Sequence, residues 1–547
     1  MVQEKRNRQA PTQWQKDLKK FHKLSDRHIL VVESDLTDTN KIMPIVRDAN
    51  NLRKAKNELV KKMQKRYHEL IRTKKYRALL KTYGKTNDEN KKKSLAKQLN
   101  EMQSDYNITW EFCRISMISI GKKYSCASVF ALTKAEDVWH GLERCLYANG
   151  KDIHFSKYTD LPCLRAKQYN KDNILKVENK QLVVYYKGQK LGLKIEDHFQ
   201  QDEINAILNY LSNAESIDKK ATETLKEEAY CIDTFRPCYV TLVPKKIRGK
   251  WRIFIHITIE GRAKKKFNKD GTLRHIYGIG TVGNDIGTQT VAYTSKNEVG
   301  LTNLAERESN TIKKEKRIKK IQRQMERSRR VTNPNNYNED GTIKKGKKTW
   351  NYSKRYKKLR ERYRELCRKS AVNREYANNE LVNHMRALGN VLITEPKNAS
   401  KLMKRSKKTT KNKNGKFNKK KRFGKSIGRR CPGGYQASLK KKFESTGGIY
   451  VEVPADYRAS QYDHTVDDFI KKALSERMFN LKGTNEKVQR DWYSSFLLYC
   501  YDYKTGNIDK DKLNKEFSRL YNKEKAFINW LICNKIKVLN SGIKIAD

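Results

Sequence analysis

No stretch of about 18 consecutive apolar residues occurs in this sequence, so it contains no candidate for a membrane-spanning helix. The first residues, Met1-Val-Gln-Glu-Lys-Arg-Asn7, lack the apolar core of a signal peptide. The ten cysteines are scattered and form no Cys-x-x-Cys pair, which argues against a disulfide framework and against a zinc knuckle. We therefore expect a cytoplasmic protein with reduced thiols and no membrane partner.

Acidic residues are also scarce relative to basic ones. The chain has 61 Asp and Glu against 120 Lys and Arg, a formal net charge of +59. A chain this basic repels itself unless a polyanion neutralises it, and nucleic acid is the obvious partner. An anionic membrane surface is the rival, but the sequence shows no basic amphipathic helix with Trp or Phe and no lipidation signal. With 547 residues, 37% of them hydrophobic, the chain is long enough for two to four domains.

The stretch from His275 to Thr294 carries the first candidate site residue. Its pattern predicts a strand, a sharp turn at Gly287 and a second strand over 290–295, which places Asp285 at the end of the first strand. The glycine lets the backbone turn away and leaves the carboxylate open, as a metal ligand requires. Taken alone, an ordinary hairpin with a turn aspartate is the simpler interpretation.

Two further carboxylates occupy similar positions. A long helix over 352–388 stops at Gly389, and the strand that follows ends in Glu395. A helix over 488–499 has Asp491 in its first turn. A ribonuclease-H-like sheet brings such positions together, and converging carboxylates can hold two Mg²⁺ ions roughly 3.5–4 Å apart across a phosphodiester.

The remaining segments indicate how the rest of the chain is organised. Helical periodicity covers 50–80, where an apolar stripe is expected to face a core, and continues over 92–119. The stripe consists of Leu52, Leu59, Met63, Tyr67 and Leu70. Short strands are predicted at 28–33 and within 174–195, and a hairpin at 239–258 turns at Arg248-Gly249. A small β domain interrupted by helices is the expected result.

Two basic segments are candidates for binding a phosphate backbone. Residues 304–330 predict a strongly basic helix. Residues 401–430 hold 15 Lys or Arg and no acid, and Gly415, Gly424 and Gly428 are expected to keep this polycation flexible. A nuclear-localisation signal is the alternative interpretation of the second segment.

Together these motifs resemble a known family. Gly-x-Asp-x-Gly at 283–287, a strand ending in Glu395, and Ser460-Gln461 about 30 residues before the Asp491 helix are similar to the TnpB proteins of bacterial transposons and to the compact type V CRISPR effectors. The basic helical insertion and the run 416–425 match as well. The resemblance is strong over 276–500 and weak over 1–275.

The resemblance implies the fold class, an α+β multidomain protein. In it, a wedge-like β-barrel with an inserted helical recognition lobe precedes a split RuvC nuclease domain. The implied boundaries are 1–45 and 146–275 for the barrel, 46–145 for the helical lobe, 276–500 for the nuclease domain (basic insertion 304–390, basic loop 401–430, degenerate zinc-ribbon region 462–490) and 501–547 for a helical extension.

The resemblance also implies an activity: RNA-guided, metal-dependent cleavage of guide-matched DNA next to a short duplex motif that the protein reads. Asp285, Glu395 and Asp491 would be the catalytic metal ligands for two Mg²⁺ ions, with Mn²⁺ as a substitute. The partners would be a guide RNA and double-stranded target DNA, bound by a monomer or dimer in the bacterial cytoplasm near the nucleoid. The nucleic-acid-binding candidates are Arg317, Lys320, Arg323, Lys416, Lys419, Lys420, Lys421, Arg422 and Lys425.

The sequence departs from the family pattern in two places. Asn284 stands where an apolar residue usually precedes the first Asp, and 462–490 lacks the four cysteines of the family's zinc ribbon, so we expect no zinc. Two alternatives stay open. A nuclease-inactive relative would act as an RNA-guided DNA-binding repressor, and a RuvC-type junction resolvase or transposon accessory nuclease would cut without a guide.

The third carboxylate has competitors. Asp463, Asp467 and Asp468 follow Ser460-Gln461, and Asp463 is expected near the site, but the sequence context of this segment is that of a turn. We favour Asp491, because Trp492, Phe496 and Leu497 on its helix would pack that helix onto the sheet.

Overall fold

The computed structural model describes Gln13 and residues 27–545, except 149, 159, 167–173, 225–235, 261–265, 269, 307–310, 404–423, 455–456, 458, 472 and 474. The chain is α+β and divides into two compact units, Met1–Lys264 and Lys265–Asp547, which are described separately below.

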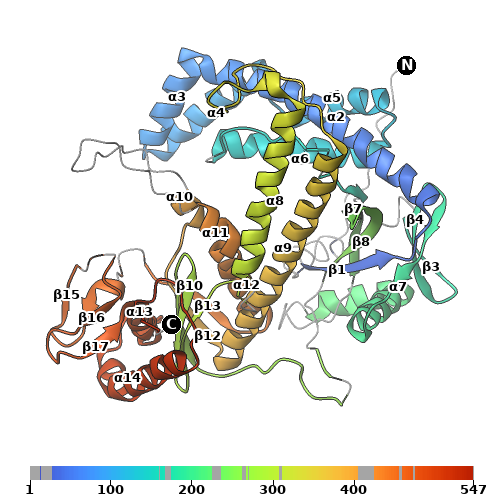
Figure 1. Cartoon of the computed structure of the whole chain (residues 1–547). Helices are drawn as coiled ribbons and strands as arrows, with labels where there is room; N and C mark the ends of the chain where they lie inside the picture. Colours follow the sequence, from blue (N-terminus) through green and yellow to red (C-terminus); the bar gives the residue numbers. More distant parts are fainter. Residues whose placement is uncertain are drawn as a thin grey trace. The chain divides into compact units, whose positions relative to one another are not determined.

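The first unit contains an antiparallel five-stranded sheet with the order β2-β7-β8-β1-β6, of which β7, β8 and β1 are labelled in Figure 1. Its strands are β1 (Arg27–Ser34), β2 (Leu164–Ala166), β6 (Leu193–Lys194), β7 (Arg236–Ile247) and β8 (Lys250–Glu260). β7 and β8 form the predicted hairpin, whose turn residues Arg248 and Gly249 both have positive φ angles, 49° and 82°. A smaller sheet joins β3 (Leu175–Glu178), β4 (Gln181–Tyr186) and β5 (Gln189–Leu191).

The expected wedge-like barrel is not closed in the described residues. The two edge strands of the larger sheet, β2 and β6, have only three and two residues. Closure would require these edges to pair with each other along a continuous ladder, and strands this short provide too few backbone groups for it. The observed sheet is therefore open.

The described residues of the first unit form six helices, and five of them lie between β1 and β2 in the sequence. They are α2 (Thr39–Arg72), α3 (Lys74–Lys85), α4 (Glu89–Asp105), α5 (Trp110–Lys123), α6 (Ser128–Tyr147) and, after β6, α7 (His198–Thr224). The predicted apolar stripe of the first helix is buried, which confirms its orientation. The stretch expected as one helix over 92–119 forms two, because Asn107 adopts a positive φ of 52° and Thr109 caps the start of α5.

The second unit is built on a mixed five-stranded sheet with the order β11-β10-β9-β12-β13 (Figure 1). Its strands are β9 (Thr281–Ile286), β10 (Thr290–Ser295), β11 (Val299–Asn303), β12 (Val391–Thr394) and β13 (Ile449–Glu452). β12 runs parallel to both β9 and β13, whereas β10 is antiparallel to β9 and β11. The carboxyl ends of β9 and β12 consequently meet at one edge of the sheet.

Seven α-helices accompany this sheet in the described residues. They are α8 (Thr311–Thr332), α9 (Lys354–Leu388), α10 (Ala399–Met403), α11 (Gly424–Arg430), α12 (Pro432–Ser445), α13 (Arg490–Tyr499) and α14 (Lys510–Cys533). α9 ends before Gly389, as predicted. The segment 401–430 is predicted to be flexible, and this prediction is wrong for its last residues. Gly424 and Gly428 lie inside α11, and Ile427 of that helix is buried. On α14, the sequence pattern predicts that Phe527, Trp530 and Leu531 face inward; Leu531 is buried, but Trp530 is 51% exposed, so the prediction is wrong for Trp530.

The helix α13 is buried on all sides and lies against β9. Every residue from Asp491 to Tyr499 is buried. Contact with the sheet depends on Gly283, where an added Cβ would collide with the backbone of Ser495 and Tyr499. The close approach of backbone to backbone explains why a glycine occupies the middle of a strand.

The region 462–490 folds into two small hairpins. One pairs β14 (Tyr462–Asp463) with β15 (Asp468–Phe469), and the other pairs β16 (Met478–Asn480) with β17 (Lys487–Gln489). A third hairpin of β18 (Tyr501–Asp502) and β19 (Asn507–Ile508) follows α13. The short 3₁₀-helices are η1 (Pro334–Asn336) and η2 (Ala459–Gln461). Among the described residues, no helix has the length and apolar character to span a membrane.

Candidate active site

Asp285 is the next-to-last residue of β9, where it pairs with Ala292 of β10 and is 8% exposed. The strand ends in a tight turn closed by the Gly287 N–H, which donates to the Thr290 carbonyl at 2.8 Å. At the neighbouring strand end, the Thr394 hydroxyl donates to the Asn284 carbonyl at 2.7 Å. This hydrogen bond fixes the end of β12 beside the end of β9.

Glu395 directly follows Thr394, so this register places it at the same sheet edge as Asp285. Pro396 restricts the backbone of Glu395 to an extended conformation, which continues the direction of the strand. Burial, and in second place the negative charge of Asp285, raises the pKa of the Glu395 carboxyl to about 7. The second cause shows that the two carboxylates interact electrostatically.

Asp491 reaches the same site from a different element. It lies in the first turn of α13, which is capped by the Gln489 side chain accepting from the Trp492 N–H at 2.7 Å. Asp491 is 9% exposed. Burial raises its pKa, and the charge of Asp285 raises it as well. Asp285 therefore interacts with both other candidates, and the fold brings together three carboxylates that are far apart in sequence.

Three cations surround these carboxylates. Lys397 Nζ lies 3.1 Å from Asp285 Oδ1. Arg477 Nη1 lies 3.5 Å from Asp491 Oδ1, and Arg490 Nε lies 3.8 Å from the same oxygen. Burial by itself lowers the pKa of the Lys397 ammonium, but Asp285, Glu395 and Asp491 outweigh this effect and raise it. Asp285 and Asp491 are thus each paired with at least one of these cations.

The donor set suits a hard divalent cation, because Mg²⁺ and Mn²⁺ prefer carboxylate oxygens. The repulsion of Asp285 by Glu395 and by Asp491 is the feature that a bound cation would relieve. In the arrangement observed, however, no group of three or more His, Cys, Asp or Glu side chains within the described ranges is positioned around a common metal point. Asp285 is instead paired with Lys397. The three carboxylates are suitable ligands for Mg²⁺, but Lys397 competes with a metal ion for the Asp285 carboxylate.

Sequence reasoning missed Lys397 and Arg477. The signal for Lys397 was the Glu395-x-Lys397 spacing, because residues two apart on an extended chain point to the same side. Arg477 had no local signal, since it lies in the loop before β16 and reaches Asp491 only through the packing of that hairpin.

The competing acidic residues make other contacts. Asp463 is fully buried and accepts hydrogen bonds from the Thr465 N–H, the Thr465 hydroxyl and the Lys482 N–H at 3.1, 2.6 and 3.0 Å. Asp467 accepts from the Tyr462 hydroxyl at 2.6 Å and pairs with Lys510. Asp468 is exposed. Each of the three has local partners, which is the turn chemistry expected from their sequence.

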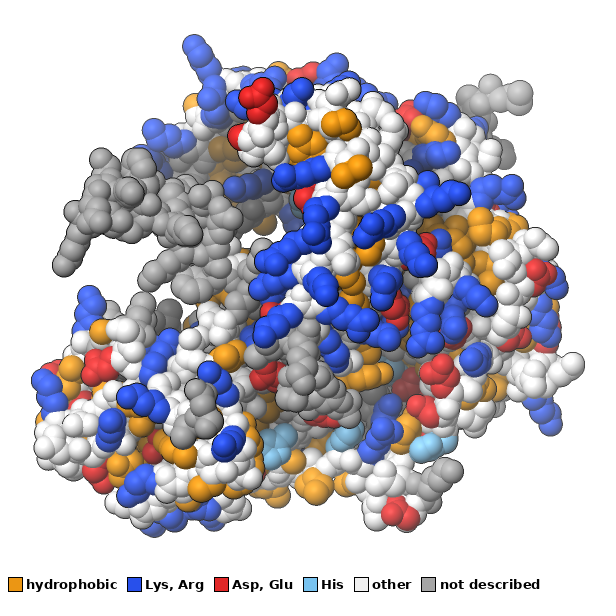
Figure 2. Space-filling model, in the orientation of Figure 1, with side chains coloured by type: hydrophobic (Ala, Val, Ile, Leu, Met, Phe, Trp, Pro, Cys, Tyr) orange, Lys and Arg blue, Asp and Glu red, His pale blue; other side chains and the backbone are white. Residues whose placement is uncertain are grey.

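The basic candidates on α8 are at the surface. Arg317, Lys320 and Arg323 are all exposed, and Figure 2 shows Lys and Arg side chains gathered over the part of the molecule where α8 and α9 lie. Lys425 lies in α11. The other candidates, Lys416, Lys419, Lys420, Lys421 and Arg422, lie outside the described residues.

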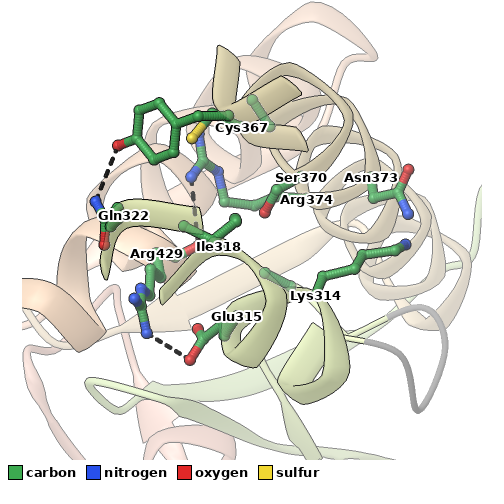
Figure 3. Close-up of a pocket in the computed structure, with 12 residues that line it drawn as sticks. Lys314, Glu315, Ile318, Gln322, Cys367, Ser370, Asn373, Arg374 and Arg429 are labelled. Carbon is green, nitrogen blue, oxygen red and sulfur yellow. Dashed lines mark hydrogen bonds and ion pairs between the residues drawn. The ribbon is translucent and has the colours of Figure 1, made fainter. Parts of the chain in front are cut away.

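A cavity of about 240 Å³ separates α8, α9 and α11. Its lining mixes apolar, neutral polar and charged side chains, and Figure 3 shows Glu315 and Arg429 pointing toward each other as an ion pair. Gln322 donates to the Tyr363 hydroxyl at 3.2 Å, and Arg374 donates to the carbonyls of Gly428 and Arg429. None of the predicted site residues lines this cavity.

No protein-family model matches the sequence, and no curated protein matches it. Solved structures do show similarity. A Cas12f1–sgRNA–target DNA complex has 12% identity and a TM-score of 0.35, with 88% of this chain and 99% of that chain covered. A Cas12i1 R-loop complex before target DNA cleavage has 9% identity and a TM-score of 0.22, with 78% and 56% covered. A Cas12i–crRNA–dsDNA complex has 10% identity and a TM-score of 0.25, with 82% and 66% covered. Identity and overlap at this level do not assign a function, which has to come from the site itself.

Proposed function

We propose that this chain is an RNA-guided DNA endonuclease that uses Asp285, Glu395 and Asp491 to hold divalent metal for phosphodiester hydrolysis. One observation carries the proposal: acidic side chains from the end of β9, the residue after β12 and the first turn of α13 interact at one edge of a mixed sheet. This is the arrangement that the motif resemblance to the RuvC nucleases of type V effectors and TnpB proteins leads us to expect.

Bringing three carboxylates together inside a protein is unfavourable, because each loses hydration and repels the others. Clusters with pKa values perturbed in this way are typical of functional sites. Bound Mg²⁺ supplies a Lewis acid for the phosphodiester and lowers the pKa of a coordinated water. The protein's own contribution is to fix the carboxylates on rigid elements, two on adjacent parallel strand ends and one on a buried helix.

The partners follow from charge and from the motif resemblance. A net charge of +59 needs a polyanion, and the exposed cations of α8 offer it a surface. We propose a guide RNA and double-stranded target DNA as these polyanions. The basic segment 401–430 and the helices of the first unit are proposed as further contacts, with the domain roles that the resemblance implies.

The test is cleavage by the chain purified with its co-expressed RNA. A plasmid matching the bound RNA should be cut in the presence of Mg²⁺ or Mn²⁺ and left intact in EDTA. Asp285→Asn and Glu395→Gln keep side-chain shape and should slow cleavage by roughly 100–1000-fold, since each removes a ligand charge worth several kcal/mol in the transition state. Both should still bind the plasmid.

The exposed residue Asp468 provides a matched control, because Asp468→Asn removes one carboxylate of the β14–β15 hairpin without touching the cluster. Its cleavage rate should equal that of the unmodified chain. Normal cleavage by Asp285→Asn would show that this site does not perform the reaction.

A second function is favoured by one observation, the ion pair between Lys397 and Asp285. A permanently paired Asp285 would give an RNA-guided DNA-binding repressor without nuclease activity. In the same experiment this protein would bind the matched plasmid tightly and leave it uncut at every metal concentration.

A further inference from the structure

A further cavity lies in the first unit, between the start of α6 and the small sheet of β3, β4 and β5. Its volume is about 310 Å³, which is at the lower end of the range of ligand sites. Phe130 and Tyr186 form an aromatic wall, because their ring centroids are 5.9 Å apart and the planes of the rings differ by 24°. Both side chains are buried, as is Ile174, which also lines the cavity. One side of the cavity is therefore aromatic and apolar.

Two exposed lysines line the same cavity. They are Lys176 of β3 and Lys187 in the turn after β4. The Lys176 ammonium lies 5.0 Å from the centroid of the Tyr185 ring, so it is held against an aromatic face. The Lys187 ammonium lies 2.7 Å from Oδ2 of Asp48, which partly neutralises it. Lys176 is therefore the stronger candidate for contact with an anionic ligand.

We infer that this cavity holds one unpaired base of the bound RNA and that Lys176 contacts the phosphate of the same nucleotide. The inference rests on the proposed function and deepens it, because it assigns one RNA contact to a specific place in the first unit. A nucleobase is flat and aromatic and stacks on aromatic side chains, while its backbone phosphate attracts an ammonium. The cavity offers an aromatic wall and a lysine in one place.

Other occupants fit the cavity less well. Bases of a DNA duplex are paired and stacked, and extruding one costs a few kcal/mol, whereas RNA loops and bulges present bases that are already unstacked. An apolar side chain of a partner protein could lie on the aromatic wall but would leave the two lysines without an anion. The net charge of +59 also favours a polyanion.

Neighbouring contacts hold the wall in place before any ligand binds. The Tyr186 hydroxyl donates to Oδ2 of Asp48 on α2 at 2.6 Å, which fixes the end of β4 against that helix. The Tyr185 hydroxyl donates to Oε1 of Glu178 in β3 at 2.7 Å. A site that is ordered in advance loses less conformational entropy on binding. The base consequently enters a preformed cavity.

The experiment begins with the full chain purified with its co-expressed RNA. Ultraviolet cross-linking and mass spectrometry should find a ribonucleotide adduct on Phe130, Tyr185 or Tyr186. The RNA is then bound, at one fixed salt concentration, to a chain in which Ala127→Leu and Val129→Leu partly fill the cavity. We expect the adduct to disappear and the affinity to fall by roughly 5- to 100-fold.

The matched control for the filled cavity is Ser128→Leu, an exposed neighbour that does not line the cavity, and it should keep both the adduct and the affinity. Thermal unfolding verifies that each variant is folded. Lys176→Ala tests the inference independently of the buried wall. It should reduce the slope of log affinity against log salt by about 1, and Lys190→Ala, exposed on the same small sheet, should not.

Two results would overturn the inference and leave the proposed function intact. One is RNA bound with adducts only elsewhere on the chain, or with a deoxyribonucleotide adduct at the cavity. The other is unchanged affinity in the filled cavity together with an unchanged salt slope in Lys176→Ala. A chain that binds no RNA at all would contradict the proposed function and the inference together.

Discussion

The Asp463 carboxylate accepts a hydrogen bond from the backbone N–H of Lys482 at 3.0 Å and thereby joins the loop of the β14–β15 hairpin to the loop of the β16–β17 hairpin. Thr465 adds a second link, because its hydroxyl donates to Asp463 and accepts from the Gly483 N–H at 2.9 Å. Hydrogen bonds thus connect the two hairpins of this chain. They lie in the stretch where the TnpB and type V effector proteins that the sequence resembles carry a four-cysteine zinc ribbon.

The first prediction is that Asp463→Ala destabilises the chain and that a zinc-selective chelator does not. The substitution leaves three partly buried hydrogen bonds without their acceptor, which should lower the free energy of unfolding by roughly 2–5 kcal/mol. Thermal and denaturant unfolding of the full chain measure the effect, and a zinc-selective chelator used with Mg²⁺ in excess should leave both curves unchanged. Asp468→Ala, on the exposed strand of the same hairpin, is the control and should stay within about 0.5 kcal/mol.

A second prediction concerns the approach of α13 to β9. Gly283→Ala places a Cβ against the backbone of Ser495 and Tyr499, so α13 has to move away from the sheet. Asp491 moves with it, and both stability and metal binding should fall. Gly84→Ala is the matched control, because nothing lies within 4 Å of a Cβ there and alanine favours the helix. Unchanged unfolding of Gly283→Ala would contradict the packing described here.

The third prediction is a pH dependence that originates at Glu524. This residue of α14 is 2% exposed and accepts from the Gln489 N–H at 3.1 Å. Burial raises the pKa of its carboxyl from 4.5 to about 8. Between pH 4.5 and pH 8, the folded chain therefore keeps a proton on Glu524 that the unfolded chain loses. The stability that this group contributes is fully present below pH 4.5 and is lost as the pH rises through 8.

Glu524→Gln should remove this dependence, since the amide is neutral at every pH and still offers an oxygen to Gln489. We expect the variant to be more stable than the unmodified chain by on the order of 2–4 kcal/mol at pH 8.5 and nearly equal to it at pH 5. Unfolding midpoints across this range provide the measurement. The exposed residue Glu476 gives a control, Glu476→Gln, and a similar gain there would show that general charge is responsible.

The fourth prediction concerns the exposed cations of α8. Replacing Arg317, Lys320 and Arg323 by Ala should weaken RNA binding and reduce the slope of log affinity against log salt by about 2–3, if each neutralises one phosphate. Filter binding at several salt concentrations measures the slope. The matched variant replaces Lys515, Lys525 and Lys535, which are exposed on and beyond α14, and should change the slope by less than about 1.

Local pattern was enough to predict several parts of this protein. The strand that ends near Asp285, the helix that begins near Asp491 and the apolar stripe of α2 follow from periodicity, glycine turns and capping residues, which act over a few neighbouring positions. Net charge likewise needed no structure. These features are properties of composition or of short segments, so the sequence determines them directly.

Tertiary structure alone decided the rest. Val391 pairs with Thr281 across more than a hundred residues of sequence, and this parallel register is what brings Glu395 beside Asp285. The same packing selects Lys397 and Arg477 as the cations at the site, exposes Trp530 and joins Asp463 to Lys482. Periodicity reports which face of an element is apolar, but it contains no information about which distant element that face will meet. The residues that each side chain contacts, and the charges that surround it, are therefore determined only when the elements pack.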